Sequence, residues 1–181
     1  MKSKAFIWDM DGTLVNSYPA IVPAAQKVCA DAGREYSFEY IYNYVIRTSV
    51  NTLLEDIAEE SGTDFRLLKE EFNRLNDSHI GAIQAISHAR DTLETLAARG
   101  HLNFVYTHRG ASCREILQQT GLLPFFTDIV TALDGFPRKP SPAAIQFLLQ
   151  RYDLKGEDSF YVGDRNLDAE AARNAGINSI L

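Results

Sequence analysis

The chain has 181 residues, is 45% hydrophobic and 23% charged, and carries a formal net charge of −6. This composition is typical of a soluble globular protein, and the length suits one domain or a domain with a modest insertion. The negative charge disfavours nucleic acid as a partner, because binding to phosphate backbones needs a surplus of Lys and Arg.

No apolar run approaches the roughly 20 residues that a membrane helix needs. The apolar stretch after Lys4 is too short for the hydrophobic part of a signal peptide. We therefore expect a cytoplasmic protein that does not bind membranes. Cys29 and Cys113 are far apart and in no CxxC pattern, which excludes a disulfide framework and a thiolate zinc site.

The first part of the chain predicts one strand followed by helices. Residues 4–9 form a short apolar run that ends abruptly at Asp-Met-Asp-Gly, as a buried strand does. From Ser17 to Ile86 the apolar residues follow helical spacing, and we find no convincing strand. Glycines interrupt this stretch where helices would stop. The pattern predicts a unit of three to five helices.

After His88 helices and strands alternate. The predicted elements are a helix at 89–99, a strand at Leu102–Tyr106, a helix at Arg114–Thr120, a strand at Asp128–Thr131, a helix at 142–152, a strand at Phe160–Val162, a helix at Leu167–Asn174 and a strand at Ile177–Leu181. This order is typical of right-handed βαβ units and a parallel sheet.

The sequence thus predicts an α/β fold with a Rossmann-like parallel sheet and an all-helical domain inserted after the first strand. Residues 1–15 and 87–181 would form the discontinuous core, and residues 16–86 the helical insertion.

Polar residues follow the ends of four predicted strands. They are Asp9 and Asp11 after the first, Thr107, His108 and Arg109 after the second, Lys139 in the loop after the third, and Asp164 and Asp168 after the fourth. Because ligand sites of parallel sheets lie outside the carboxyl ends of the strands, we expect these side chains to meet at one edge.

These residue types indicate phosphoryl chemistry. Crowded carboxylates repel one another unless a cation holds them, and all-oxygen ligation suits Mg²⁺. Of two aspartates in one turn, Asp9 could attack while Asp11 handles the proton. A Lys and a Thr hydroxyl can bind phosphoryl oxygens. Each motif alone also has a structural explanation: Thr107 could be a cap and Lys139 a solvated loop cation.

The combined pattern resembles the haloacid dehalogenase superfamily of phosphohydrolases. Asp9-Met10-Asp11-Gly12-Thr13 resembles its first motif, the strand Phe104–Thr107 its second, Lys139-Pro140 its third, and Gly163-Asp164 with Asp168 its fourth. The helical insertion after the first motif resembles the type I cap of the phosphoglycolate phosphatase-like branch.

The resemblance implies a role for each matching position. Asp9 would attack phosphorus and form an aspartyl-phosphate, and Asp11 would protonate the leaving group and then activate water. Asp9, the Asp11 backbone carbonyl and Asp164 would bind Mg²⁺, with Asp168 positioning the ligands. Thr107 and Lys139 would hold the phosphoryl group and the charge on Asp9.

Differences between this chain and individual branches of the family reduce the number of activities that we expect. Dehalogenases and phosphonate hydrolases lack the second Asp of the first motif, so Asp11 argues against both. Hexose-phosphate mutases carry a His where this chain has Ile21, which argues against a mutase.

Several cations are candidates for substrate binding. His108, Arg109 and Arg165 add positive charge near the site, and we expect Arg109 or Arg165 to contact the substrate or a cap carboxylate, unless it pairs with an acid on the surface. Arg47 lies about where relatives place a substrate-specificity loop and could meet an anionic substrate group.

The predicted function is a Mg²⁺-dependent phosphatase of a small phosphorylated metabolite, working as a monomer or homodimer. Two alternatives stay open: phosphoryl transfer to another acceptor, as in a mutase, and a non-catalytic regulatory protein that keeps the fold. The complete set of motif residues speaks against the second. The chain ends at Leu181, where relatives usually add a loop and a helix, so either the protein is short or a segment is missing.

Overall fold

The computed structural model describes residues 3–181, and over that range it confirms the predicted α/β class with a parallel sheet. Five strands pair in the order β5-β4-β1-β6-β7, and each adjacent pair is parallel. The strands are β1 (Ala5–Trp8), β4 (Leu102–Tyr106), β5 (Asp128–Val130), β6 (Ser159–Val162) and β7 (Asn178–Ile180). Strand β1 is therefore central, with β4 and β6 on either side.

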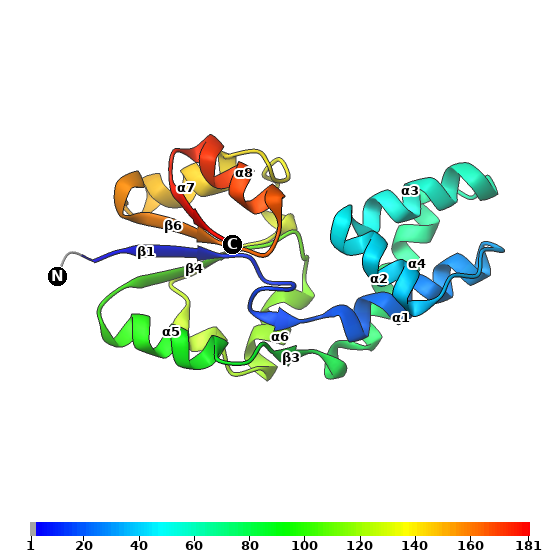
Figure 1. Ribbon diagram of the computed structural model, residues 1–181, viewed down its shortest axis with the longest axis horizontal. Coiled ribbons are helices and arrows are strands. Elements are labelled where there is room, and N and C mark those ends of the chain that lie inside the picture. Colours follow the sequence, from blue (N-terminus) through cyan, green and yellow to red (C-terminus); the bar gives the residue numbers. More distant parts are fainter. Residues whose placement is uncertain (1–2) are drawn as a thin grey trace. The chain divides into compact units, whose positions relative to one another are not determined.

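Helices cover both faces of this sheet (Figure 1). They are α5 (Ala89–Ala98) and α6 (Ser112–Gln119) on one face, and α7 (Ala143–Arg151) and α8 (Asn166–Ala175) on the other. On the α7 and α8 face, Ile7, Phe104 and Tyr161 are fully buried among Ile145 and Leu148. This burial fixes the register of the central strands and so the positions of the residues that follow them.

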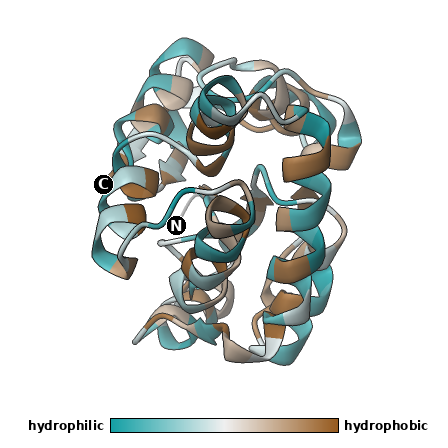
Figure 2. Cartoon of the chain, turned by 90° about the vertical axis from the view of Figure 1, so that its right-hand side faces the viewer, coloured by the Kyte–Doolittle hydropathy of each residue, from teal (hydrophilic) through white to brown (hydrophobic). Residues whose placement is uncertain are grey.

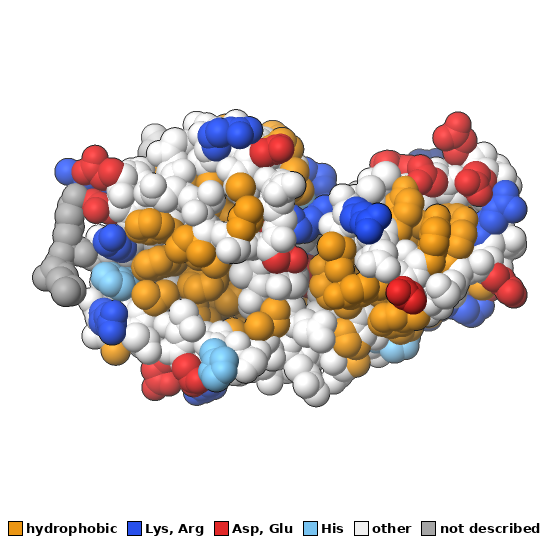
Figure 3. Space-filling model, in the orientation of Figure 1, with side chains coloured by type: hydrophobic (Ala, Val, Ile, Leu, Met, Phe, Trp, Pro, Cys, Tyr) orange, Lys and Arg blue, Asp and Glu red, His pale blue; other side chains and the backbone are white. Residues whose placement is uncertain are grey.

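The sheet edge at β7 is partly apolar at its surface. Ile180 and Leu181 expose 45% and 67% of their surface. Figure 3 shows hydrophobic side chains gathered over this part of the α/β unit in the view drawn.

A second compact unit, Ser17–Ile83, is helical. It holds α1 (Tyr18–Asp31), α2 (Phe38–Arg47), α3 (Val50–Ser61), α4 (Phe65–Ser78) and the 3₁₀ helix η1 (Ile80–Ala82). Figure 2 shows hydrophobic and hydrophilic residues on opposite sides of individual helices. The hydrophobic sides, which include Ile41, Leu54 and Ile57, form a core of their own.

Both chain crossings between the units run through a small antiparallel ribbon that the sequence pattern did not predict. Strand β2 (Val15–Asn16) pairs with β3 (Gln84–Ala85), and Ile86 N–H donates to the Leu14 carbonyl at 2.9 Å. The α/β unit consequently runs to Asn16 and resumes at Gln84, whereas the sequence placed these boundaries after residues 15 and 86.

Further 3₁₀ turns occur at η2 (Leu123–Phe125), η3 (Ala132–Asp134) and η4 (Gly156–Asp158). None of the helices within residues 3–181 combines the length and the apolar character that crossing a membrane requires.

Candidate active site

Asp9 lies directly beyond the central strand, at the edge where the carboxyl ends of β1, β4 and β6 meet. Its backbone N–H continues the ladder by donating to the Val162 carbonyl at 2.8 Å, and the residue is only 7% exposed. Strands β4 and β5 lie on one side of β1, and β6 and β7 lie on the other, so Asp9 stands at the topological switch point where α/β proteins bind ligands.

The turn after Asp9 requires a glycine. The Met10 carbonyl accepts from the N–H groups of Leu14 and Val15 at 2.9 and 3.0 Å, and Gly12 adopts φ +87°. A Cβ at Gly12 would lie 2.4 Å from a carboxylate oxygen of Asp164, so only glycine lets the two strand ends approach this closely. Thr13 Oγ1 donates to Asp164 Oδ1 at 3.3 Å from the same turn.

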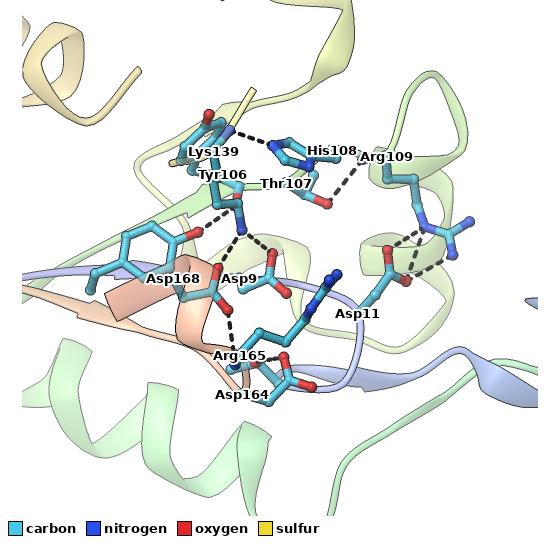
Figure 4. Close-up of polar contacts among 12 residues, drawn as sticks. Asp9, Asp11, Tyr106, Thr107, His108, Arg109, Lys139, Asp164, Arg165 and Asp168 are labelled. Atoms are coloured by element: carbon cyan, nitrogen blue, oxygen red, sulfur yellow. Dashed lines mark hydrogen bonds and ion pairs between the residues drawn. The ribbon is translucent and has the colours of Figure 1, made fainter. Parts of the chain in front are cut away.

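Lys139 is the centre of a buried ionic cluster (Figure 4). Its Nζ donates to Asp9 Oδ1 at 2.6 Å and to Asp168 Oδ1 at 2.7 Å. The ammonium group also lies over the rings of Tyr106 and Tyr161, at 5.2 and 5.1 Å from their centroids, within the range of cation–π attraction. Two carboxylates and two aromatic faces thus fix its direction.

The charges of this cluster depend on one another. Burial raises the pKa of the Asp9 carboxyl to about 7, Lys139 opposes the rise, and Asp168 adds to it. Burial by itself lowers the pKa of Lys139, but Asp9 and Asp168 outweigh it and hold that pKa well above its usual range. Lys139 therefore stays charged, and Asp9 needs further positive charge to be fully ionised at neutral pH.

Three carboxylates are placed to share a cation. Single oxygens of Asp9, Asp164 and Asp168 all lie within 4.8 Å of one another. Hard oxygen donors in this number suit Mg²⁺, which is commonly held by few carboxylates and completes its shell with water and phosphate oxygens. The side chain of Asp11 is outside this group of three, and the predicted role of its backbone carbonyl as a ligand stays a prediction.

The carboxylate of Asp11 forms an ion pair with the guanidinium of Arg109. Arg109 Nη2 donates to Asp11 Oδ1 at 2.8 Å, and Nε donates to both carboxylate oxygens at 3.2 and 3.3 Å. Thr107 is 1% exposed, and its Oγ1 accepts from the Arg109 N–H at 3.1 Å, which leaves the Thr107 hydroxyl proton available to a ligand.

His108 joins two loops of the site. Its Nε2 accepts from the Lys139 backbone N–H at 2.9 Å, and its Nδ1 lies 3.0 Å from Arg138 Nη2. Burial, followed by the charges of Lys139 and Arg138, lowers the pKa of His108 to about 3. The ring is therefore neutral near pH 7, and it supports the loop that carries Lys139.

The other two cations that the sequence singled out are Arg165 and Arg47. Arg165 donates its backbone N–H to Asp168 Oδ2 at 3.2 Å, and Figure 4 shows its side chain extending toward the acidic groups. Arg47 is the last residue of α2, in the helical unit, and is exposed.

Sequence reasoning did not single out Tyr106 and Tyr161. Both are buried strand residues, and in the sequence they look like ordinary core aromatics. Their contact with Lys139 arises because β4 and β6, the two strands that flank β1, place the rings on one face of the sheet. The Tyr161 hydroxyl fixes this arrangement by donating to the Tyr106 carbonyl at 2.9 Å.

Comparison with known proteins places these residues in a family context. A family model described as haloacid dehalogenase-like hydrolase matches residues 6–181. The chain is 28% identical to a phosphoglycolate phosphatase of Vibrio parahaemolyticus, over 97% of this chain and 82% of that protein. It is 27% identical to the pyrophosphatase PpaX of Oceanobacillus iheyensis, over 99% and 83% of the two chains. A solved structure, a hydrolase from Streptococcus pneumoniae TIGR4, superimposes with a TM-score of 0.70 at 27% identity, over 99% of this chain and 92% of that one.

Proposed function

The chain belongs to the haloacid dehalogenase-like hydrolase family, and from that membership and the geometry of its site we propose that it hydrolyses a small phosphate monoester through a phosphoryl group carried on Asp9. It is a phosphoric monoester hydrolase, as the phosphatases among its relatives indicate. The observation that carries the proposed mechanism is the buried carboxylate of Asp9, held 2.6 Å from the Lys139 ammonium beside two further aspartates.

In the first step an oxygen of Asp9 attacks phosphorus. The bond from phosphorus to the leaving oxygen breaks, and Asp11 supplies the proton that this oxygen needs. Lys139 and the Thr107 hydroxyl stabilise the negative charge on the phosphoryl oxygens. In the second step Asp11 takes a proton from water as the water oxygen attacks phosphorus, which returns Asp9 as a carboxylate and releases inorganic phosphate.

Mg²⁺ fits the carboxylate cluster and would be held by Asp9, Asp164 and Asp168. When bound, it supplies positive charge that keeps Asp9 ionised and lowers the repulsion between Asp9 and the phosphate dianion. The raised pKa of Asp9 supports this need for a cation.

The substrate is proposed to be a small phosphorylated metabolite. The names of the relatives suggest 2-phosphoglycolate and inorganic pyrophosphate as the first compounds to test. Sugar phosphates and nucleoside monophosphates complete a panel that covers different leaving groups.

The test is release of inorganic phosphate from this panel, with Mg²⁺ and with EDTA, by the parent protein and Asp9→Asn. We expect Mg²⁺-dependent turnover that Asp9→Asn loses, and transient phosphorylation of the parent detected by mass spectrometry after acid quenching. Asp91→Asn, which removes an exposed carboxylate on α5, is the control. Equal activity in Asp9→Asn and the parent would contradict the proposal, and a phosphorylated product other than inorganic phosphate would indicate transfer instead of hydrolysis.

A further inference from the structure

The pairing of Arg109 with Asp11 is not explained by the phosphoryl-binding contacts of the site. The guanidinium meets the carboxylate through two of its nitrogens, with three donor–acceptor distances between 2.8 and 3.3 Å. Figure 4 shows the two side chains pointing toward one another. A fork of this kind fixes both the direction and the rotation of a carboxylate, which a single donor cannot do.

Arg109 is itself held at several points. Its N–H donates to Thr107 Oγ1 at 3.1 Å, its carbonyl accepts from the Ala132 N–H at 3.0 Å, and its Nη1 lies 3.5 Å from Ser112 Oγ. The side chain is only 6% exposed. An arginine this enclosed has little surface left for a substrate, so its principal partner is Asp11.

We propose that Arg109 is a positioning residue that holds the carboxyl group of Asp11 in one orientation for proton transfer. This inference rests on the proposed function, in which Asp11 gives a proton to the leaving oxygen and later takes one from water. Without the guanidinium, the Asp11 side chain can rotate about its own bonds, and the fraction of time it spends in the productive orientation falls. Arg109 thereby acts on the step at the leaving group and has no direct contact with the phosphoryl group.

Comparing kcat/KM for substrates with different leaving groups distinguishes a positioning role of Arg109 from a purely structural one. An alkyl phosphate needs its leaving oxygen protonated, because an alkoxide is a poor leaving group. The p-nitrophenolate of p-nitrophenyl phosphate leaves without a proton. If Arg109 acts through Asp11, its loss lowers kcat/KM for alkyl esters and spares the aryl ester.

The experiment compares the parent with Arg109→Gln and Arg109→Lys, using p-nitrophenyl phosphate and the best alkyl ester of the substrate panel. In Arg109→Gln we expect kcat/KM to fall about 100-fold for the alkyl ester, the lower end of what positioned proton transfer contributes, and less than about 5-fold for the aryl ester. Arg109→Lys keeps the charge but loses the fork, so it should remain well below the parent on the alkyl ester. Arg114→Gln, an exposed arginine on α6, is the matched control.

Two further measurements separate the possible outcomes. In an Asp11→Asn background, Arg109→Gln should cause no additional loss, because the two residues act as a unit. Added guanidinium chloride at millimolar concentration should partly restore alkyl-ester turnover by Arg109→Ala.

An equal fall for both esters in Arg109→Gln, or no fall for the alkyl ester, overturns this inference while leaving the proposed function standing. A parent protein that turns over neither ester overturns both.

Discussion

The ammonium nitrogen of Lys139 lies 2.6 Å from a carboxylate oxygen of Asp9, and their side chains are only 3% and 10% exposed. The same nitrogen bridges to Asp168 at 2.7 Å. One buried cation therefore separates two buried carboxylates, and the fold and the proposed chemistry depend on the same contact.

Replacing this cation should destabilise the protein strongly. In Lys139→Met, Asp9 and Asp168 face each other without compensation, and losing one partner of a buried ion pair typically costs about 3–5 kcal/mol. Urea unfolding without Mg²⁺ at pH 8, which is above the pKa of about 7 that Asp9 has in the parent, measures this loss. Lys155→Met, which removes an exposed Lys, serves as the control. Equal stability of the two variants would contradict the predicted contribution of Lys139 to the free energy of unfolding.

The ring of Tyr161 should matter more than its hydroxyl. Tyr161→Phe keeps the face under Lys139 and loses one hydrogen bond to the Tyr106 carbonyl, so we expect about 1 kcal/mol of lost stability and kcat within a few-fold of the parent. Tyr161→Leu removes the ring, and we expect a loss of about 3 kcal/mol and a larger fall in kcat. Urea unfolding and phosphate release test both variants. Indistinguishable kcat values for Phe and Leu would show that the aromatic face does not position Lys139.

Gly12→Ala should weaken cation binding. The added methyl group would lie 2.4 Å from an oxygen of Asp164, and φ +87° strains any residue with a Cβ. We expect the Mg²⁺ concentration for half-maximal activity to rise about 10-fold or more, equivalent to about 1.4 kcal/mol.

The control for this substitution is Gly100→Ala, at φ +76° with nothing within 4 Å of the added Cβ. It carries the backbone strain alone, so its Mg²⁺ dependence should match that of the parent. If both alanine variants shift Mg²⁺ dependence equally, the close approach of Gly12 to Asp164 is not the cause.

His108 should make the protein sensitive to mild acid. Its pKa is about 3 in the folded protein and about 6.5 in an unfolded chain. Between these values the unfolded chain binds the extra proton, so stability is present above pH 6.5 and is lost as the pH falls, by up to about 1.4 kcal/mol per pH unit.

His108→Gln removes this contribution. The difference in unfolding free energy between pH 7 and pH 5 should therefore be smaller in this variant than in the parent, by up to about 2 kcal/mol. Urea unfolding at the two pH values measures it, with His79→Gln, an exposed histidine of the helical unit, as the control. An unchanged difference in His108→Gln would exclude the histidine as the source.

The sequence was informative where strand ends carry the chemistry. Because parallel strands end at one edge, the positions of Asp9, Thr107 and Asp164 after apolar runs were enough to place them near one another. Helical spacing was likewise enough to identify the unit that the structure bounds at Ser17 and Ile83.

Contacts that depend on the direction of a side chain could not be predicted from the sequence. Arg109 and Asp11 lie 98 positions apart, and nothing in either segment distinguishes an arginine that points at an aspartate from one that points at a ligand. Strands β2 and β3 were missed for a different reason: two residues are too few to show an alternating pattern, and their pairing joins distant segments.

The ribbon of β2 and β3 also has a consequence for how the chain can vary. Val15–Asn16 and Gln84–Ala85 are hydrogen-bonded neighbours. For the folding of the α/β unit, the segment between them is therefore equivalent to a loop whose two ends are held together. The entropy of closing such a loop grows only with the logarithm of its length, by about 0.6 kcal/mol for each doubling. Helices could therefore be added to or removed from this insertion with little effect on how the α/β unit folds, which makes the ribbon a natural place to exchange one insertion for another.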